Sequence, residues 1–324
     1  MGRLPLLGRR RVAQAVSIPE EWLRLHPHRL LGLLLFGLFF VSITAGTQAQ
    51  EPVPEGKATV DSGEATAIPA PSNLFLPQGE LFEPLLADLQ WPRFSAEYQW
   101  RFGTDEFDRL AAVSFGESFA LVRSPEQPWG RWEIGMQAKV DAIFDMTTQS
   151  FDLSNENYFV AVTGAVEVGG ITTQLRISHT SSHLGDEYLL ETGSTRESVS
   201  YETIDVLASY PIGRGLRVYG GGGVYASARP DFDPVLTQLG FEWVAPISLA
   251  SGWLHPVLAT DLHLRQENDW IPEVAVLAAL RLAHPLDDLR HLEFYLRFYH
   301  GRSPEGQFYR QTIDSLGIGL RFGF

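Results

Sequence analysis

The sequence predicts an all-β protein, a closed antiparallel transmembrane β-barrel of about 12 strands, and three observations support that fold class. Apolar and polar side chains alternate with a period of two from Phe94 to the last residue, Phe324. The alternating segments are about 9–12 residues long, which suits a tilted bilayer crossing better than the roughly six residues of an average strand. The chain also begins like an exported protein. We therefore expect a barrel in the outer membrane of a Gram-negative bacterium.

The amino-acid composition excludes several kinds of site and partner. The chain has 324 residues, no cysteine and a formal net charge of −14. Without cysteine it lacks disulfides, thiolate metal sites and a lipid-modified N-terminal cysteine. The acidic balance argues against nucleic acid as a partner, because phosphate contacts need a basic surface. Residues 1–49 hold six Arg against two Glu, a net of +4, which leaves −18 for the remaining chain.

The N-terminus has the features of a secretory signal. Positive charge in GRRRVAQ precedes an apolar run from Leu30 to Ala45, which is shorter than the roughly 20 residues of a membrane-spanning helix. The run leads to Thr47-Gln48-Ala49, a cleavage site of the A-x-A type. We interpret residues 1–49 as a signal peptide, with an uncleaved inner-membrane anchor as the alternative.

Two further segments follow the signal. Residues 50–73 are rich in Pro, Ala, Glu and Ser, so we expect a flexible periplasmic leader. The barrel occupies residues 74–324 and begins with a short ordered approach, LFLPQGELFEPLLADLQWPRF, with one or two helical turns.

The alternation has the polarity of a membrane barrel, in which apolar side chains face lipid and charged ones line the lumen. HLEFYLRFY, for example, alternates Leu292, Phe294, Leu296 and Phe298 with Glu293, Tyr295 and Arg297. Aromatic residues gather at strand ends, as an interfacial girdle requires: Trp132, Phe144, Trp243, Trp253, Phe298 and Phe324. An alternating strand that ends in Phe324 resembles the signal read by the outer-membrane barrel assembly machinery, which is therefore an expected partner.

The strands are expected near residues 93–103, 108–119, 131–144, 157–168, 171–182, 198–210, 214–226, 235–246, 253–265, 273–283, 290–300 and 311–324. Their connections alternate in length. Gly169-Gly170 and Pro211–Gly215 are short periplasmic turns, whereas Asp145–Asn157 and residues 183–197 are long external loops. Unpaired backbone groups are too costly in lipid, so the first strand must pair with the last.

Three stretches, LFEPLLADLQWPRFSAEY, AAVSFGESF and HTSSHLGDE, are similar to the bacterial envelope family known as domain of unknown function 1207. The resemblance covers roughly Leu74 to Phe324, and HTSSHLGDE is its most specific stretch. It implies an outer-membrane location and assigns no activity.

HTSSHLGDE also holds the candidate catalytic residues. His179 and Ser181 share the apolar face of their strand with Ile177, so both should face lipid near the outer surface. A neutral imidazole beside a serine is the minimum base and nucleophile for acyl transfer. This His-x-Ser arrangement is similar to outer-membrane phospholipase A and to the lipid A 3-O-deacylase. The resemblance implies that His179 is the base, Ser181 the nucleophile, and an outer-leaflet lipid ester the substrate.

The third catalytic residue depends on strand register. If Ile177 pairs with Ile204, Glu202 falls beside His179, whereas a bulge near Tyr201 would turn Glu202 inward. Glu191 and Glu197 are the other candidates.

His183, Asp186 and Glu187 are candidate ligands for a divalent cation such as calcium, with Asp186 and Glu187 providing the hard oxygen atoms; the alternative is that the three fix the turn at Gly185. The alternative for the whole stretch is a hydrogen-bonded loop anchor on a structural or narrow-pore barrel without catalytic activity.

The lumen offers weaker candidates. His255, Asp261 and His263 share one face of their strand, where an interior polar network is the ordinary expectation and a metal site the alternative. Gly220–Gly223 should permit curvature or a close neighbour rather than bind a nucleotide. Charges of both signs should pair across the lumen and narrow it: Glu97, Arg101, Glu133, Lys139, Arg176, Arg217, Glu242, Arg265, Glu273, Arg281, Glu293 and Arg297.

Overall fold

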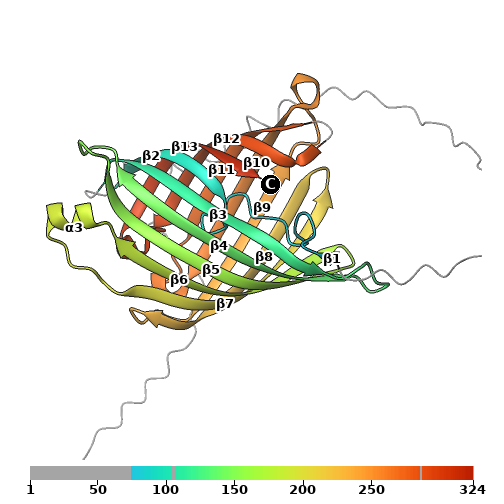
Figure 1. Ribbon diagram of the computed structural model, residues 1–324, viewed down its shortest axis with the longest axis horizontal. Coiled ribbons are helices and arrows are strands. Elements are labelled where there is room, and N and C mark those ends of the chain that lie inside the picture. Colours follow the sequence, from blue (N-terminus) through green and yellow to red (C-terminus); the bar gives the residue numbers. More distant parts are fainter. Residues whose placement is uncertain (1–73, 104–106, 285–286, 324) are drawn as a thin grey trace, which may run out of the picture. The chain divides into compact units, whose positions relative to one another are not determined.

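The computed structural model describes residues 74–103, 107–284 and 287–323. The expected signal peptide (1–49), the expected leader (50–73) and Phe324 lie outside these residues. Within the described part of the chain, twelve long antiparallel strands form a closed barrel, in which β13 pairs with β2 (Figure 1). The fold class predicted from the period of two is therefore confirmed.

The strands are β1 (Leu74–Phe75), β2 (Phe94–Phe102), β3 (Arg109–Arg123), β4 (Arg131–Asp145), β5 (Asp152–Val168), β6 (Ile171–Leu184), β7 (Val199–Gly213), β8 (Leu216–Arg229), β9 (Val235–Val244), β10 (Leu254–Arg265), β11 (Glu273–His284), β12 (Asp287–Arg302) and β13 (Thr312–Gly323). Short helical pieces lie at α3 (Asp186–Thr192), η1 (Ala250–Gly252), η2 (Gln266–Asn268) and η3 (Gly306–Phe308). No helix among the described residues is long and apolar enough to cross a membrane.

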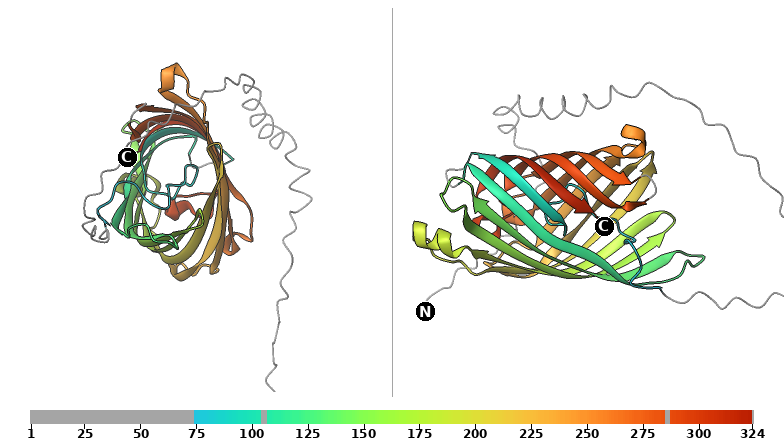
Figure 2. Two further views of the ribbon diagram at one scale, coloured as in Figure 1. Left: turned by 90° about the vertical axis from the view of Figure 1, so that its right-hand side faces the viewer. Right: turned by 45° about the horizontal axis from the view of Figure 1, so that its top comes forward.

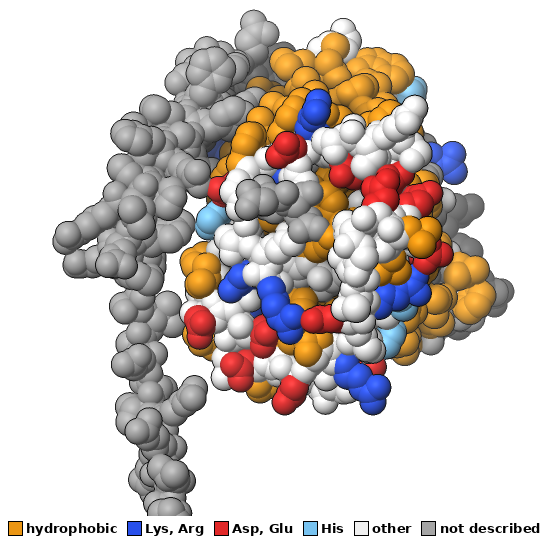
Figure 3. Space-filling model, turned by 90° about the vertical axis from the view of Figure 1, so that its left-hand side faces the viewer, with side chains coloured by type: hydrophobic (Ala, Val, Ile, Leu, Met, Phe, Trp, Pro, Cys, Tyr) orange, Lys and Arg blue, Asp and Glu red, His pale blue; other side chains and the backbone are white. Residues whose placement is uncertain are grey.

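The two ends of the barrel differ in their connections. Gly169 and Gly170 join β5 to β6 with φ of 60° and 82°, the two positive values that a type I′ hairpin turn requires. The opposite end carries α3 and the longer connections, so we take it as the external end. Figure 3 looks onto this end, where acidic and basic side chains are interspersed. The loop expected over Asp145–Asn157 is shorter than predicted, because β5 already begins at Asp152.

The approach to the first strand differs most from expectation. Residues 76–93 contain no helix; they form an irregular segment, here called the luminal plug, that lies inside the ring of strands (Figure 2, left). β1 and β2 both pair with β3: Phe75 with Val122, and Ser95 with Ser114. Phe75 and Ser95 are thus 20 residues apart in the chain, but their partners on β3 are only 8 residues apart. β1 and β2 therefore act as two pieces of one strand beside β3, and the plug is the chain between them, which turns into the lumen.

Apolar packing and cationic side chains both hold the plug. Leu81, Phe82, Leu85 and Trp91 are buried against the luminal side chains Ala165, Leu207 and Tyr219. Apart from the N–H of Leu76, which donates to Leu121 O of β3, the plug pairs with no strand in the described part of the chain, so its carbonyl groups need other donors. Wall residues supply them: Arg217 donates to Glu83 O and Pro84 O, and Lys139 donates to Leu89 O.

The remaining luminal charges pair as the alternation predicts. Buried ion pairs join Arg101 to Glu305, Arg176 to Asp205, Arg217 to Glu242, Arg265 to Glu273, Arg297 to Glu97, and both Arg281 and Arg321 to Glu293. The charges therefore narrow the lumen together with the plug, which sequence reasoning missed.

Gly220–Gly223 allow close approach between strands. A Cβ atom on Gly221 would lie 2.0 Å from Val206 O, and one on Gly223 would lie 2.5 Å from Ile204 O. The glycine run is a packing feature of β8, as expected.

Candidate active site

The register of β6 against β7 decides which side chains meet on the outer wall. Ile177 pairs with Ile204, and His179 therefore pairs with Glu202 and Ser181 with Ser200. The irregularity near Glu202 lies in the neighbouring strand: Glu202 pairs with Ser227 and Thr203 with Tyr225, so Ala226 is the extra residue of β8. Glu202 consequently keeps the same face as His179.

That face is the outside of the barrel. The apolar side chains around His179 are exposed: Ile177 by 54%, Val160 by 46% and Ile204 by 41%. The alternating residues Arg176 and Ser178 are buried on the luminal side. An exposed apolar wall is the lipid-contacting surface of a membrane barrel, so His179 lies where a lipid chain would touch the protein.

The imidazole of His179 contacts a carboxylate. Its Nδ1 lies 2.9 Å from Glu202 Oε1, and the two side chains are 47% and 45% exposed. Ser227 also hydrogen-bonds to Glu202 from the other side. A carboxylate at Nδ1 favours the tautomer with the hydrogen on Nδ1, which leaves the lone pair of Nε2 available to accept a proton.

Ser181 lies on the same wall, two residues beyond His179 and half-buried. It stands between Tyr158 of β5 and Ser200 of β7. Among the contacts of the described residues, no hydrogen bond joins Ser181 Oγ to the His179 ring. Such bonds are often long without substrate, and rotation about one side-chain torsion moves the hydroxyl.

The other candidate carboxylates have different partners. Glu197 forms an ion pair with Arg310, with Nη1 and Oε1 2.9 Å apart. The charge of Asp152 raises the pKa of Glu191 in α3. Glu202 is therefore the carboxylate that the fold brings to His179.

The predicted cation ligands are engaged within the protein. Asp186 pairs with Arg196, and Glu187 Oε2 accepts a hydrogen bond of 2.8 Å from the backbone N–H of Leu153. In the described part of the chain, neither belongs to a group of three converging metal-ligating side chains.

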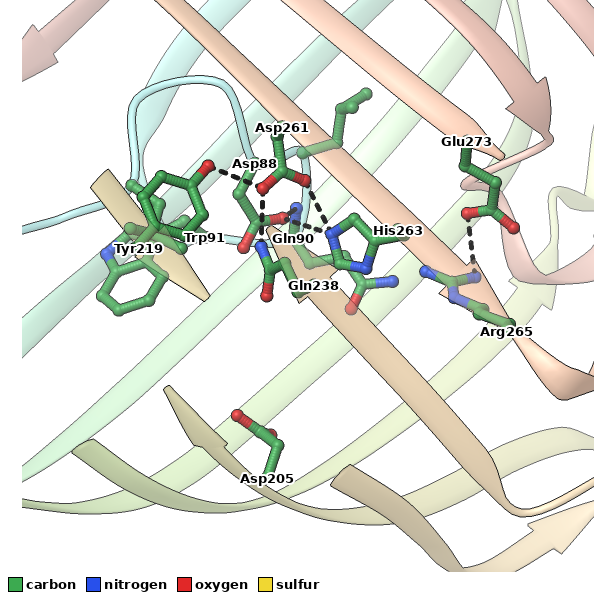
Figure 4. Close-up of polar contacts among 12 residues, drawn as sticks. Asp88, Gln90, Trp91, Asp205, Tyr219, Gln238, Asp261, His263, Arg265 and Glu273 are labelled. Carbon is green, nitrogen blue, oxygen red and sulfur yellow. Dashed lines mark hydrogen bonds and ion pairs between the residues drawn. The ribbon is translucent and has the colours of Figure 1, made fainter. Parts of the chain in front are cut away.

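The luminal candidates separate into two sets. Asp261 and His263 are in contact, with Oδ2 and Nε2 2.8 Å apart, whereas His255 does not join them and hydrogen-bonds to Gly252 O. Asp88 of the luminal plug completes this cluster (Figure 4). Sequence reasoning missed Asp88, because only the path of the plug brings it there.

Together, the closed barrel, the lipid-facing wall and the charged, plugged lumen define a β-barrel of the outer-membrane type. The family model described as "Protein of unknown function (DUF1207)" matches residues 41–324, so the chain belongs to this family. None of the curated proteins matches the chain.

Solved structures of outer-membrane proteins are similar to this chain. The outer membrane phospholipase dimer of Salmonella typhi with bound calcium is similar, with a TM-score of 0.51 and 12% identity, over 76% of this chain and 94% of that one. An active-site mutant of the outer membrane phospholipase A of Escherichia coli gives the same four values. The KdgM porin has a TM-score of 0.40 and 9% identity, over 71% of this chain and 99% of that one. At these identities the phospholipase matches establish a common barrel fold.

Proposed function

We propose that this barrel is a lipid acyl-ester hydrolase of the outer membrane, with Ser181 as nucleophile, His179 as base and Glu202 as the residue that orients His179. The observation that carries the proposal is the contact between His179 Nδ1 and Glu202 Oε1 on the lipid-facing wall. At the headgroup boundary, where water can reach both side chains, an isolated exposed pair adds little to stability. A carboxylate, an imidazole and a hydroxyl in this order are the parts of a serine hydrolase.

The chemistry follows from the roles. Ser181 Oγ attacks the ester carbonyl carbon as its proton passes to His179 Nε2. The tetrahedral intermediate then expels the alcohol, which takes that proton, and leaves an acyl group on Ser181. Water, deprotonated by the same imidazole, releases the fatty acid and restores the serine.

The location suits a lipid substrate. His179 and Ser181 lie toward the external end of β6, whose other end begins at the short turn before Ile171. The ester groups of an outer-leaflet lipid lie near that boundary, and exposed apolar residues such as Val160 and Ile177 would contact its acyl chains. Outer-membrane lipids are thus the proposed partners.

The intermediate also needs a positive counter-charge or N–H donors. We assign this role to a backbone N–H near Ser182 or to a divalent cation such as calcium held by Asp186 and Glu187. Binding that cation requires the carboxylates to give up Arg196 and the N–H of Leu153.

The test is fatty-acid release by purified, folded protein from phospholipid or lipopolysaccharide. Ser181→Ala should abolish release, whereas Ser200→Ala, a serine on the same wall in the paired position, should retain it. Both variants must keep the heat-modifiable mobility of a folded barrel. If Ser181→Ala is as active as the parent, His179 and Ser181 are only a hydrogen-bonded rim and HTSSHLGDE anchors the external loop. A folded parent that releases no fatty acid would be a structural barrel.

A further inference from the structure

Inside the barrel, three side chains of metal-ligating type converge from two separate parts of the chain (Figure 4). Asp261 and His263 project into the lumen from β10, and Asp88 comes from the luminal plug. His263 Nε2 lies 2.8 Å from Asp261 Oδ2 and 3.7 Å from Asp88 Oδ1. One ligand atom from each of the three lies within 4.8 Å of the others.

The cluster lacks a full set of hydrogen bonds. Asp88 and Asp261 are 0% and 1% exposed. His263 Nε2 carries one hydrogen and can donate a good hydrogen bond to only one of the two carboxylates. Nε2 lies nearer to Asp261 than to Asp88. Asp88 Oδ2 is buried without a hydrogen-bond partner in the described part of the chain. A buried carboxylate oxygen in this state is costly unless a cation compensates it.

The spacing suits a metal ion. Histidine nitrogen and carboxylate oxygen bind zinc at about 2.0–2.2 Å, so ligand atoms in a tetrahedral shell are about 3.3 Å apart. The measured separations of 2.8 and 3.7 Å lie on either side of that value. An imidazole nitrogen beside carboxylate oxygens suits zinc or another transition metal, whereas calcium and magnesium prefer oxygen alone.

Neighbouring donors orient the carboxylates. Tyr219 Oη donates to Asp261 Oδ1 at 2.6 Å, and Gln238 Nε2 donates to the same oxygen at 2.8 Å. The backbone N–H of Gln90 donates to Asp88 Oδ1 at 2.8 Å. Each carboxylate oxygen has two lone pairs, so these contacts leave Asp261 Oδ2 and both oxygens of Asp88 with a lone pair for an ion. Second contacts that hold the ligating carboxylates are typical of metal sites.

We propose that Asp88, Asp261 and His263 bind one divalent transition-metal ion, which fastens the luminal plug to the barrel wall. The plug supplies one ligand and β10 supplies two, so the site is complete only when the plug is seated. This proposal is independent of any activity at Ser181.

The experiment uses untagged, full-length protein, folded, stripped with a chelator and titrated with Co²⁺ and then Zn²⁺. The parent should bind about one equivalent and give the visible absorption bands of low-symmetry Co²⁺, which Zn²⁺ should displace. Asp88→Asn and His263→Gln should lose this binding at least tenfold. His255→Gln is the matched control, because His255 lies on the same strand outside the cluster.

A second readout is the temperature at which the barrel loses its heat-modifiable mobility. Zn²⁺ should raise it in the parent and in His255→Gln, and leave it unchanged in His263→Gln. If the folded parent binds no Co²⁺ and Zn²⁺ does not change its unfolding temperature, the cluster is a hydrogen-bonded triad only. Equal binding by the parent and by His263→Gln would place the ion elsewhere and also overturn the proposal. A folded parent that binds no metal overturns the proposal even where a variant fails to fold.

Discussion

His179 and Glu202 lie directly opposite each other on adjacent strands, with Nδ1 2.9 Å from Oε1 on the outer wall of the barrel. Both side chains are about half exposed and lie near the headgroup boundary, where water can reach them, so their contact adds little to stability. Its value lies in holding the imidazole in one tautomer and one orientation. If the barrel is a lipid hydrolase, the contact between His179 and Glu202 should therefore affect the rate of hydrolysis rather than the folding of the barrel.

Glu202→Gln is the variant that separates these effects. An amide is nearly the same size as a carboxylate but stabilises an imidazolium poorly, so kcat for lipid hydrolysis should fall about tenfold or more. The unfolding temperature should change little. Ser227→Ala, which removes the other neighbour of Glu202, is the control and should keep most activity. A Glu202→Gln protein with parental kcat would remove Glu202 from the mechanism.

Glu305 should make the external loop between β12 and β13 sensitive to acid. Burial opposes ionisation of Glu305, but the charge of Arg101, 2.6 Å away, outweighs it and lowers the pKa of Glu305. A lowered pKa contributes stability that is present above the usual glutamate value of about 4.3 and is lost as the pH falls through the lower folded-state value.

Amide hydrogen exchange over residues 303–311 measures this effect. In the parent, exchange, corrected for its intrinsic pH dependence, should become several-fold faster when the pH is lowered from 7 to 3. Glu305→Gln should exchange fast at both values. An acid response that survives in Glu305→Gln would mean that another group controls the loop.

The sequence predicts the barrel well because one face of each strand contacts lipid and the other faces a polar lumen, and the two faces require very different side chains. A one-residue slip in β12 would move Glu293 and Arg297 from the lumen into lipid, so the alternation fixes both strand and register. The same reasoning places Glu202 beside His179 from a single assumption, the pairing of Ile177 with Ile204.

The luminal plug could not be predicted in this way. It has no periodic pattern, and its partners are remote in sequence: Arg321 donates to Leu86 O across 235 residues, and Arg217 donates to Pro84 O across 133. Asp88 is missed for the same reason. An apolar stretch such as LFEPLLADLQW ahead of the first strand was the available signal, since these side chains must be buried somewhere.

The interpretation of residues 1–49 as a signal peptide predicts where the mature chain begins. If residues 1–49 are a signal peptide, mass spectrometry of protein extracted from outer membranes should find a chain that begins at Gln50. Replacing Ala49 with a large residue should block cleavage and leave the full-length chain. A full-length chain in the parent would favour the membrane-anchor interpretation.

The luminal plug should close the barrel to ions. Residues 76–93 occupy the lumen, and charged wall residues bind their backbone. The parent should therefore show at most a small conductance in planar bilayers. The informative variant replaces residues 77–92 with a Gly-Ser linker of about six residues. The strand partners Val122 and Ser114 are only eight residues apart on β3, and extended chain advances about 3.3 Å per residue, so a linker of this length spans the gap. This linker can continue the interrupted strand without entering the lumen.

Removing the plug should produce stable open-channel steps and make cells more sensitive to antibiotics that the outer membrane normally excludes. The variant must first show heat-modifiable mobility, which proves that the wall has closed. Arg217→Gln is a graded comparison: it removes the donor to Glu83 O and Pro84 O while leaving the plug in place, so it should give brief, infrequent openings. If the plug-free barrel folds and conducts no better than the parent, the paired luminal charges alone seal it, and the plug serves another purpose.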